Sequence, residues 1–235
     1  KKILITGHTG FKGTWLSRIL VLAGAQVYGL SLEAEKDSLF TKIESLGIKE
    51  SSILDIRDRA GVENYFKSHS FDGIFHLAAQ PLVRRSYKEP IETFNTNVMG
   101  TAHVLNSVVS SNAANWVVVI TTDKVYRNVE KLEGYVEDEP LGGKDPYSAS
   151  KASGNFFVDA YYETYDMNVV MTSCSNNYGP HQHREKLIPT IVRTALAGDD
   201  IPIYGKGDNV RDWLFVEDHC VAIDEVFHNG KVGEI

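Results

Sequence analysis

The stretch "ITGHTGFKG", residues 5–13, decides the fold of this chain. It places Gly7, Gly10 and Gly13 at three-residue spacing, between the apolar run 3–5 and an apolar-periodic stretch that begins near Trp15. This pattern predicts a strand, a tight turn and a helix. Glycine permits the turn, lets backbone N–H groups approach a pyrophosphate, and allows the helix to pack closely on the strand. We therefore predict a dinucleotide-binding turn, with cofactor contacts at Gly7, Thr9, Gly10, Phe11, Lys12 and Gly13.

The rest of the chain alternates between strand-like and helix-like segments. Further strands are expected at 26–30, 53–54, 73–76, 116–120 and 169–171, and helices near 58–67, 89–112, 146–165 and 186–197. Parallel strands need crossover connections, so this alternation predicts an α/β fold with a parallel sheet covered on both faces. The last residues, "NGKVGEI", resemble the start of a strand, and the first residue is not Met. We expect the sequence to be a fragment of a longer chain.

Composition excludes several classes of function. The 235 residues contain 24 Lys and Arg against 31 Asp and Glu, a formal charge of -7, so we expect no nucleic-acid or membrane-surface partner. No apolar run approaches the length of a membrane span, and we expect a cytoplasmic protein. Cys174 and Cys220 are expected to be buried thiols. His181 and His183 lack further ligands at metal-binding spacing, so no metal is expected.

The segments after the other strands suggest which dinucleotide is bound. Ser31 stands near the end of the second strand, where an acidic residue usually holds the ribose, and Glu33 lies two residues further on. No Arg is nearby to receive a 2′-phosphate, which favours NAD over NADP. Asp55 and Ile56 are expected to contact the adenine. The run Leu77-Ala78-Ala79 is expected to line the cofactor channel, with plain packing as the alternative.

A helix start and a strand end carry the candidate chemistry. "DPYSASK" has Asp145 as a predicted N-cap and puts Tyr147 and Lys151 on one helix face. Lowering the pKa of a tyrosine from about 10 to about 7 requires roughly 4 kcal/mol, which a nearby cation can supply. "TTDKVY", residues 121–126, follows a buried strand and is either a solvated loop with an exposed ion pair or part of a reaction centre.

In this order, the glycine turn, the polar strand end and the Tyr-x-x-x-Lys pair resemble the extended short-chain dehydrogenase/reductase superfamily. The resemblance implies a Rossmann-like doubly wound parallel sheet with a small, apparently truncated C-terminal substrate-binding domain. We expect an NAD-binding domain over 1–173 and a partial substrate-binding region over 174–235. It also implies that Tyr147 is the acid/base at a sugar carbon, that Lys151 lowers its pKa and binds the nicotinamide ribose, and that Thr122 holds the reacting hydroxyl.

The finer resemblance is to the nucleotide-sugar 4,6-dehydratases. "TGHTGFKGTWL", "HLAAQPLVRRSYKEP" and the 121–151 region are similar to CDP-glucose 4,6-dehydratases. "SCSNNYGPHQHREKLIP" and "IPIYGKGDNVRDWLFVEDH" are more similar to the dTDP-glucose enzymes. CDP-glucose is therefore the first candidate substrate and dTDP-glucose the second.

In these enzymes NAD oxidises C4, water is lost across C5 and C6, and the hydride returns to C6. The resemblance makes Asp123 the acid on the leaving hydroxyl and Lys124 the candidate base at C5. Each of these side chains stabilises the charged form of the other, which opposes both roles. Lys124 is therefore either the base or an orienting group.

The resemblance also implies ligand contacts along the chain. Further cofactor contacts fall on Thr96 and Asn177. The expected substrate contacts are Gln80, Arg85, Ser86, Thr122, Asn176, Lys186, Leu187, Pro202, Ile203, Tyr204 and Arg211.

The helices at 89–112 and 146–165 resemble the pair that forms a dimeric four-helix bundle, with core packing alone as the alternative. A homodimer is the expected assembly. Two other functions stay open. A nucleotide-sugar 4-epimerase needs Tyr147 and Lys151 but neither Asp123 nor Lys124, and a non-catalytic NAD-binding module needs only the turn.

Overall fold

The central sheet has the parallel, doubly wound arrangement that was expected. A computed structural model describes residues 1–203 and 205–235. Its main sheet is parallel throughout, in the order β3-β2-β1-β4-β5-β6. This is the doubly wound dinucleotide-binding order, which reverses direction between β1 and β4 and opens a crevice at the carboxyl ends of those strands. The predicted α/β, Rossmann-like fold is confirmed. The strands are β1 Lys2–Thr6, β2 Gln26–Ser31, β3 Glu50–Ile53, β4 Gly73–His76, β5 Val117–Ile120 and β6 Val169–Thr172.

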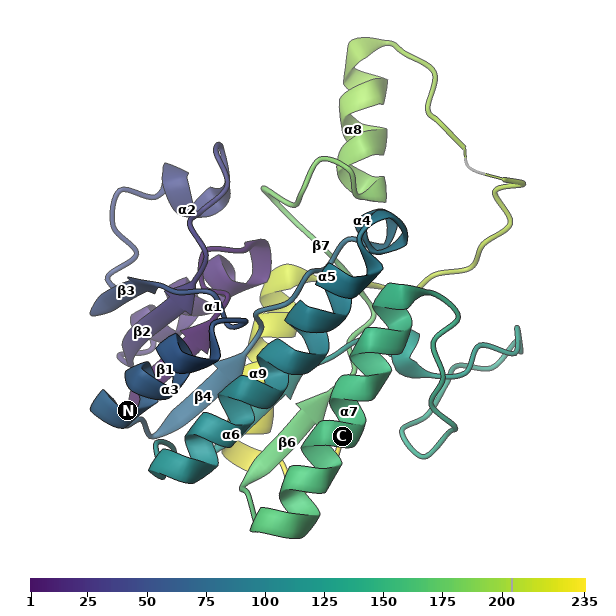
Figure 1. Cartoon of the computed structure of the whole chain (residues 1–235). Coiled ribbons are helices and arrows are strands. Elements are labelled where there is room, and N and C mark those ends of the chain that lie inside the picture. Colours follow the sequence, from purple (N-terminus) through teal and green to yellow (C-terminus); the bar gives the residue numbers. More distant parts are fainter. Residues whose placement is uncertain (204) are drawn as a thin grey trace.

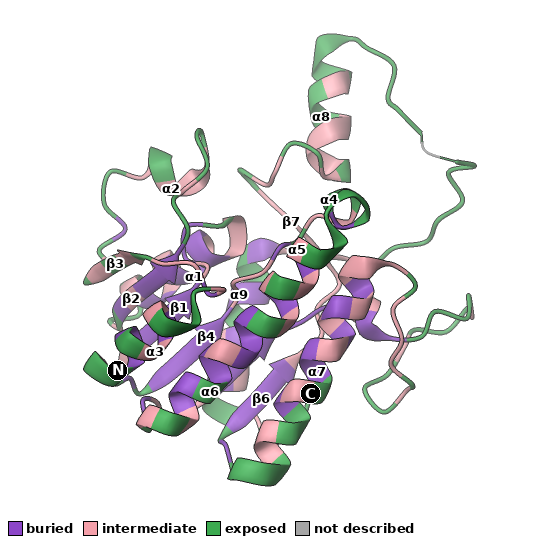
Figure 2. Cartoon of the chain, viewed as in Figure 1, coloured by how far each residue is buried: buried purple, intermediate pink, exposed green. Residues whose placement is uncertain are grey.

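Helices cover both faces of this sheet (Figure 1). One face carries α3 (Arg59–Ser68), α6 (Thr101–Ser111) and α7 (Pro146–Tyr165), and the other carries α1 (Phe11–Leu22) and α9 (Val216–Asn229). β4 and β5 are buried along their whole length, as expected for strands covered on both sides (Figure 2). Apolar residues alone fill β5, which explains why its position was predictable.

Helix boundaries follow the sequence pattern where caps are present. α7 spans the predicted range 146–165, because the Asp145 side chain accepts from the Ser148 N–H at 3.0 Å and Pro146 occupies the first position. The predicted helix at 89–112 is divided into α5 (Pro90–Phe94), the π-helix η1 (Asn95–Gly100) and α6. The predicted helices near 58–67 and 186–197 correspond to α3 and α8 (Leu187–Ala197). Elements that we did not predict are α2 Leu39–Lys42, α4 Val83–Lys88, η2 Asp123–Val125, β7 Asn176–Tyr178, β8 Trp213–Phe215 and α9.

The last third of the chain divides between the sheet and a projection. β7 and β8 pair in parallel beside the carboxyl edge of the main sheet. α8 stands away from the sheet and has no buried residue (Figures 1 and 2). α9 returns to the sheet, and Phe227 packs on Phe75 of β4 with ring centroids 5.2 Å apart. The boundary at residue 173 between an NAD-binding domain and a substrate-binding region stays a prediction.

The final residues run beside β6. The Gly233 N–H donates to the Val169 carbonyl at 2.9 Å, and the Met171 N–H donates to the Glu234 carbonyl at 3.1 Å. No described helix combines the length and the apolar character that a bilayer span requires. Within residues 1–203 and 205–235, no group of three or more His, Cys, Asp or Glu side chains is arranged to hold a metal ion.

Candidate active site

The glycine turn forms a cradle that side chains would fill. Gly7 has φ +77°, in the left-handed region that favours glycine. A Cβ on Gly13 would lie 2.1 Å from the Gly7 carbonyl oxygen, so only glycine fits between turn and helix. α1 starts after Gly10 without a side-chain cap, which leaves the first N–H groups of the helix for an anion. These features fit a dinucleotide pyrophosphate.

The carboxyl ends of β2 and β4 complete the walls of this cradle. The Thr9 hydroxyl donates to the Leu32 carbonyl at 3.0 Å and lies 2.8 Å from the hydroxyl of Ser31. The Ala78 N–H donates to Thr6 Oγ1 at 3.2 Å, and a Cβ on Gly7 would lie 2.9 Å from the Ala78 nitrogen. The Leu77-Ala78-Ala79 segment is therefore in contact with the turn, as a channel wall requires.

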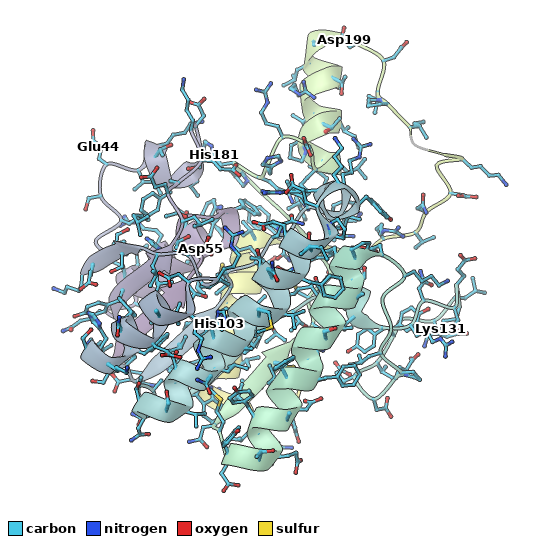
Figure 3. All side chains as sticks on the ribbon, in the orientation of Figure 1. Glu44, Asp55, His103, Lys131, His181 and Asp199 are labelled. Atoms are coloured by element: carbon cyan, nitrogen blue, oxygen red, sulfur yellow. The ribbon has the colours of Figure 1, made fainter. Side chains whose placement is uncertain are left out.

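A cavity of about 510 Å³ opens at the end of β3. It is lined by Asp55, Arg57, Asp58, Asn95, Met99 and His103, and Figure 3 labels Asp55 and His103. Arg57 holds the Asp55 carboxylate through both oxygens and also pairs with Glu92. The hydrogen bond from Arg57 lowers the pKa of Asp55. Ile56, beside this cavity, is buried, while the Thr96 hydroxyl donates to the Glu92 carbonyl at 2.9 Å.

The Tyr-Lys pair points to the end of β5. The Lys151 ammonium donates to the Ile120 carbonyl at 2.9 Å. Burial lowers the pKa of Lys151 to about 8, with a further contribution from the charge of Lys12. Burial raises the pKa of Tyr147 above its ordinary 10, Cys174 acts in the same direction, and a hydrogen bond with Thr122 opposes them. Tyr147 is therefore a phenol at neutral pH in this site, and the phenolate needs an added positive charge.

The predicted acid and base lie beside this pair. The Thr122 hydroxyl donates to Asp123 Oδ1 at 3.0 Å, and the Lys124 ammonium donates to the same oxygen at 3.2 Å. Lys124 also donates to Asn176 Oδ1 at 2.9 Å, which connects the ends of β5 and β7. Asp123 acts electrostatically on Tyr147, so the carboxylate and the phenol share one region. The structure brings Thr122, Asp123, Lys124, Tyr147, Lys151 and Asn176 together.

Two further predicted contacts, Asn177 in β7 and Lys186 before α8, also reach this region. Asn177 Oδ1 lies 3.9 Å from the sulfur of Cys174, and the Asn177 amide nitrogen has no hydrogen-bond partner among residues 1–203 and 205–235. Lys186 donates to the Pro81 carbonyl at 3.3 Å. Burial, followed by the charges of Lys124 and Lys12, lowers the pKa of Lys186. An anion placed among these ammonium groups would therefore be stabilised.

Other predicted substrate residues lie outside this cluster or have internal partners. The Gln80 side chain binds Leu82 and Thr93, and buried Ser86 donates to the Val83 carbonyl at 2.7 Å. Arg85 is half exposed and pairs with Glu89. Leu187 is 46% exposed and Ile203 is 73% exposed, so in this arrangement neither is enclosed. Pro202 and Arg211 are also exposed, and Tyr204 lies outside the described residues.

Two residues near the site were not predicted. Asn97 is buried in η1 and joins the Gln80 backbone to Ser150, between Tyr147 and Lys151 on α7. Cys174 is half-buried at the end of β6, not buried as expected, and its sulfur lies 3.4 Å from the Lys12 ammonium. Cys220 is buried, as expected. Cys174 could have been identified as a site residue because it follows a buried strand, where polar side chains gather at the carboxyl edge of the sheet. The helical periodicity around Asn97 did not indicate that this residue belongs to the site.

Comparison with known proteins agrees with this geometry. Residues 4–235 match the family described as GDP-mannose 4,6 dehydratase. The chain is 37% identical over 252 residues to a dTDP-glucose 4,6-dehydratase of Xanthomonas campestris pv. campestris, covering 98% of this chain and 69% of that protein. It is 43% identical over 227 residues to the CDP-glucose 4,6-dehydratase of Salmonella typhimurium, covering 92% of this chain and 63% of that protein.

The fold is similar to that of a solved relative with its cofactor. The dTDP-glucose 4,6-dehydratase of Streptomyces venezuelae, solved with NAD bound, has a TM-score of 0.91 and 34% identity. The match covers 100% of this chain and 74% of that one. By fold, by the clustered Tyr147, Lys151 and Asp123, and by similarity along nearly its whole length, the chain belongs to the GDP-mannose 4,6-dehydratase family of NAD-dependent nucleotide-sugar dehydratases.

Proposed function

We propose that this chain acts as an NAD-dependent nucleotide-sugar 4,6-dehydratase, which converts an NDP-glucose into the NDP-4-keto-6-deoxyglucose. The observation that carries the proposal is the contact of Thr122 and Lys124 with Asp123 in the region that also holds Tyr147. An oxidation at C4 uses Tyr147 and Lys151. The additional carboxylate at the end of β5 supplies the acid that a loss of water requires.

The residues of the cradle would hold the cofactor. Gly7, Gly10 and Gly13 leave room for a diphosphate, and the free N–H groups at the α1 N-terminus would donate to it. When bound, NAD accepts a hydride from C4 and later returns it to C6, so the reaction has no net redox change. The amide nitrogen of Asn177 lacks a partner in the described part of the chain and would be available to donate to the cofactor.

The side chains of the cluster then divide the proton transfers among them. With the positive charge of bound, oxidised nicotinamide added to that of Lys151, Tyr147 would be a phenolate and take the proton of the C4 hydroxyl, which Thr122 orients. The C4 ketone acidifies the C5 hydrogen, and the C5 proton passes to solvent water. Asp123 in its protonated form donates a proton to the C6 oxygen as the C6–O bond breaks and water leaves, and the resulting carboxylate is reprotonated from solvent. The Lys124 ammonium donates to both Asp123 and Asn176 and so orients these two side chains.

CDP-glucose is the first candidate substrate and dTDP-glucose the second. The higher identity to the CDP-glucose enzyme, 43% against 37%, supports this order. The ammonium groups of Lys12 and Lys186 suit the diphosphate common to both.

We also propose a homodimer through a four-helix bundle of the α5–α6 region and α7. Ile91 (73% exposed), Phe156 (61%) and Met99 (45%) present large apolar side chains on these helices, which supports an interface there. The free thiols Cys174 and Cys220 support a reducing compartment, and we place the protein in the cytoplasm.

The function is tested by incubating the protein with NAD and CDP-, dTDP- or UDP-glucose and following product mass. We expect loss of one water. Asp123→Asn should slow the elimination by about 10²–10⁴-fold while C4 oxidation persists, and exposed Asp138→Asn serves as the control. Conserved mass with inversion at C4 would indicate the epimerase alternative. Cofactor binding with no turnover of any sugar nucleotide would indicate the non-catalytic module.

A further inference from the structure

The ammonium of Lys12 contacts the segment that follows β6. Lys12 is the second residue of α1, yet its Nζ lies 3.4 Å from the sulfur of Cys174 at the end of β6. Cys174 in turn donates to the Thr121 carbonyl at 3.5 Å. Within the described part of the chain, Lys12 has no carboxylate partner. A cation of this kind acts on its neighbours through its full charge.

Lys151 binds the backbone next to the carbonyl that Cys174 contacts. Its ammonium donates to the Ile120 carbonyl, one residue before Thr121. Among the residues whose contacts are described, Lys151 also lacks a carboxylate partner. Two ammonium groups from different helices are thus fixed around the same strand end, and each raises the free energy of charging the other.

We propose that Lys12 is a positioning residue of the acid–base pair, whose ammonium controls how readily Lys151 carries its charge beside Tyr147. The effect of Lys12 on Lys151 acts in this direction, after that of burial. The role is distinct from cofactor binding by the turn. Its catalytic consequence rests on the proposed function, whereas the interaction between the two ammonium groups does not.

The other titratable groups around Lys151 do not replace this charge. His76 of β4 is neutral, because burial and then Lys151 lower its pKa to about 3. Tyr147, one turn earlier on α7, is a neutral phenol. Cys174 lies against the Lys12 ammonium and raises the pKa of Lys151, which opposes the effect of Lys12, and Asp123 is paired with Lys124. Lys12 is therefore the charged residue whose substitution should change the pKa of Lys151.

The direct test is a titration of Lys151 by NMR, in protein with ¹³C-labelled lysine and without cofactor. The Lys151 signal is assigned by its loss in Lys151→Arg. We expect a midpoint near 8 in the unsubstituted protein and a higher one in Lys12→Met. At pH 8 the ratio of neutral to charged Lys151 should fall about three- to tenfold. Lys12→Arg should restore the midpoint, and Lys67→Met on α3 should leave it unchanged.

A second variant and a second readout separate this role from others. Lys12→Gln replaces Lys12→Met if the latter fails to fold by circular dichroism. In the pH profile of C4 oxidation at saturating NAD, the limb that belongs to Lys151 should move upward with the NMR midpoint. An unchanged Lys151 midpoint in a folded variant overturns the proposal, even if its affinity for NAD falls. Absence of dehydration by the unsubstituted protein would refute the proposed function and leave the titration result standing.

Discussion

Asn97→Ala removes the side chain that connects the loop after β4 to the helix of the Tyr-Lys pair. Asn97 is 2% exposed in η1. Its Oδ1 accepts from the Gln80 N–H at 2.8 Å, and its Nδ2 donates to the Gln80 carbonyl at 3.2 Å and to Ser150 Oγ at 2.9 Å. Because π-helices often occur at functional sites, we expect this connection to matter for both stability and catalysis.

The expected loss of stability in Asn97→Ala follows from the polar groups that lose their hydrogen-bond partner. The Ser150 hydroxyl keeps its bond to the Tyr147 carbonyl at 2.7 Å, so the main losses fall on the N–H and carbonyl of Gln80. Each buried backbone group without a partner costs about 1–3 kcal/mol, and for the two Gln80 groups we expect the free energy of unfolding to fall by about 2–6 kcal/mol. At about 2–4 °C per kcal/mol for a protein of this size, Tm should fall by roughly 4–24 °C.

Urea and thermal unfolding measure this effect, with exposed Asn64→Ala on α3 as the matched control. The control should change the free energy of unfolding by less than about 0.5 kcal/mol. Asn97→Asp should also be destabilising, because it loses both donor bonds and introduces a buried charge. Equal stability of Asn97→Ala and Asn64→Ala would refute the reasoning, since it would mean that the Gln80 backbone groups find other partners.

Three further predictions concern the cofactor, the pH dependence and the base. Gly13→Ala places a Cβ 2.1 Å from the Gly7 carbonyl oxygen and should weaken NAD binding more than about tenfold by calorimetry, whereas Gly134→Ala, which meets nothing within 4 Å, should not. Burial lowers the pKa of His8 to about 4 and of His76 to about 3. Below pH 6.5, the ordinary pKa of histidine, the unfolded chain therefore binds protons that the folded protein does not. The free energy of unfolding from urea melts should therefore fall as pH decreases from 6.5 toward 4, by up to about 1.4 kcal/mol per pH unit for each histidine, and His76→Gln should reduce this slope. Lys124→Met should keep C5 exchange with solvent deuterium within about tenfold, and a loss of 10²–10⁴-fold would instead identify Lys124 as the base.

Local signals explain which parts of the fold were predictable. The turn at Gly7 and Gly13 was predicted because no side chain fits where the helix meets the strand. α7 was predicted to the residue because Asp145 and Pro146 define its start chemically. The parallel arrangement of the sheet was predicted from the crossover rule, which needs only the alternation of elements and not their exact limits.

Other elements depend on tertiary contacts that the sequence does not display. α5, η1 and α6 have one continuous helical pattern, and the π-helix arises where Asn97 turns inward to Gln80. α9 did carry a local signal that was missed, since Val216, Cys220 and Ile223 recur at helical spacing and share one buried face. Gln80 and Ser86 were predicted as substrate contacts from resemblance, whereas in this arrangement their side chains bind the loop itself.

The charge at the site is opposite to the charge of the whole protein, and this contrast bears on how substrates are recognised. The chain has a formal charge of -7, yet Lys12, Lys151 and Lys186 converge without carboxylate partners among the residues that the structure describes. Net charge alone would repel a nucleotide diphosphate at long range, and salt screens that repulsion beyond about 8 Å at physiological ionic strength. Within the crevice the three ammonium groups act at short range and in a partly desolvated setting, where each is worth more than on the surface. Binding should therefore depend on entry into the crevice, where the diphosphate supplies the negative charge that these lysines lack.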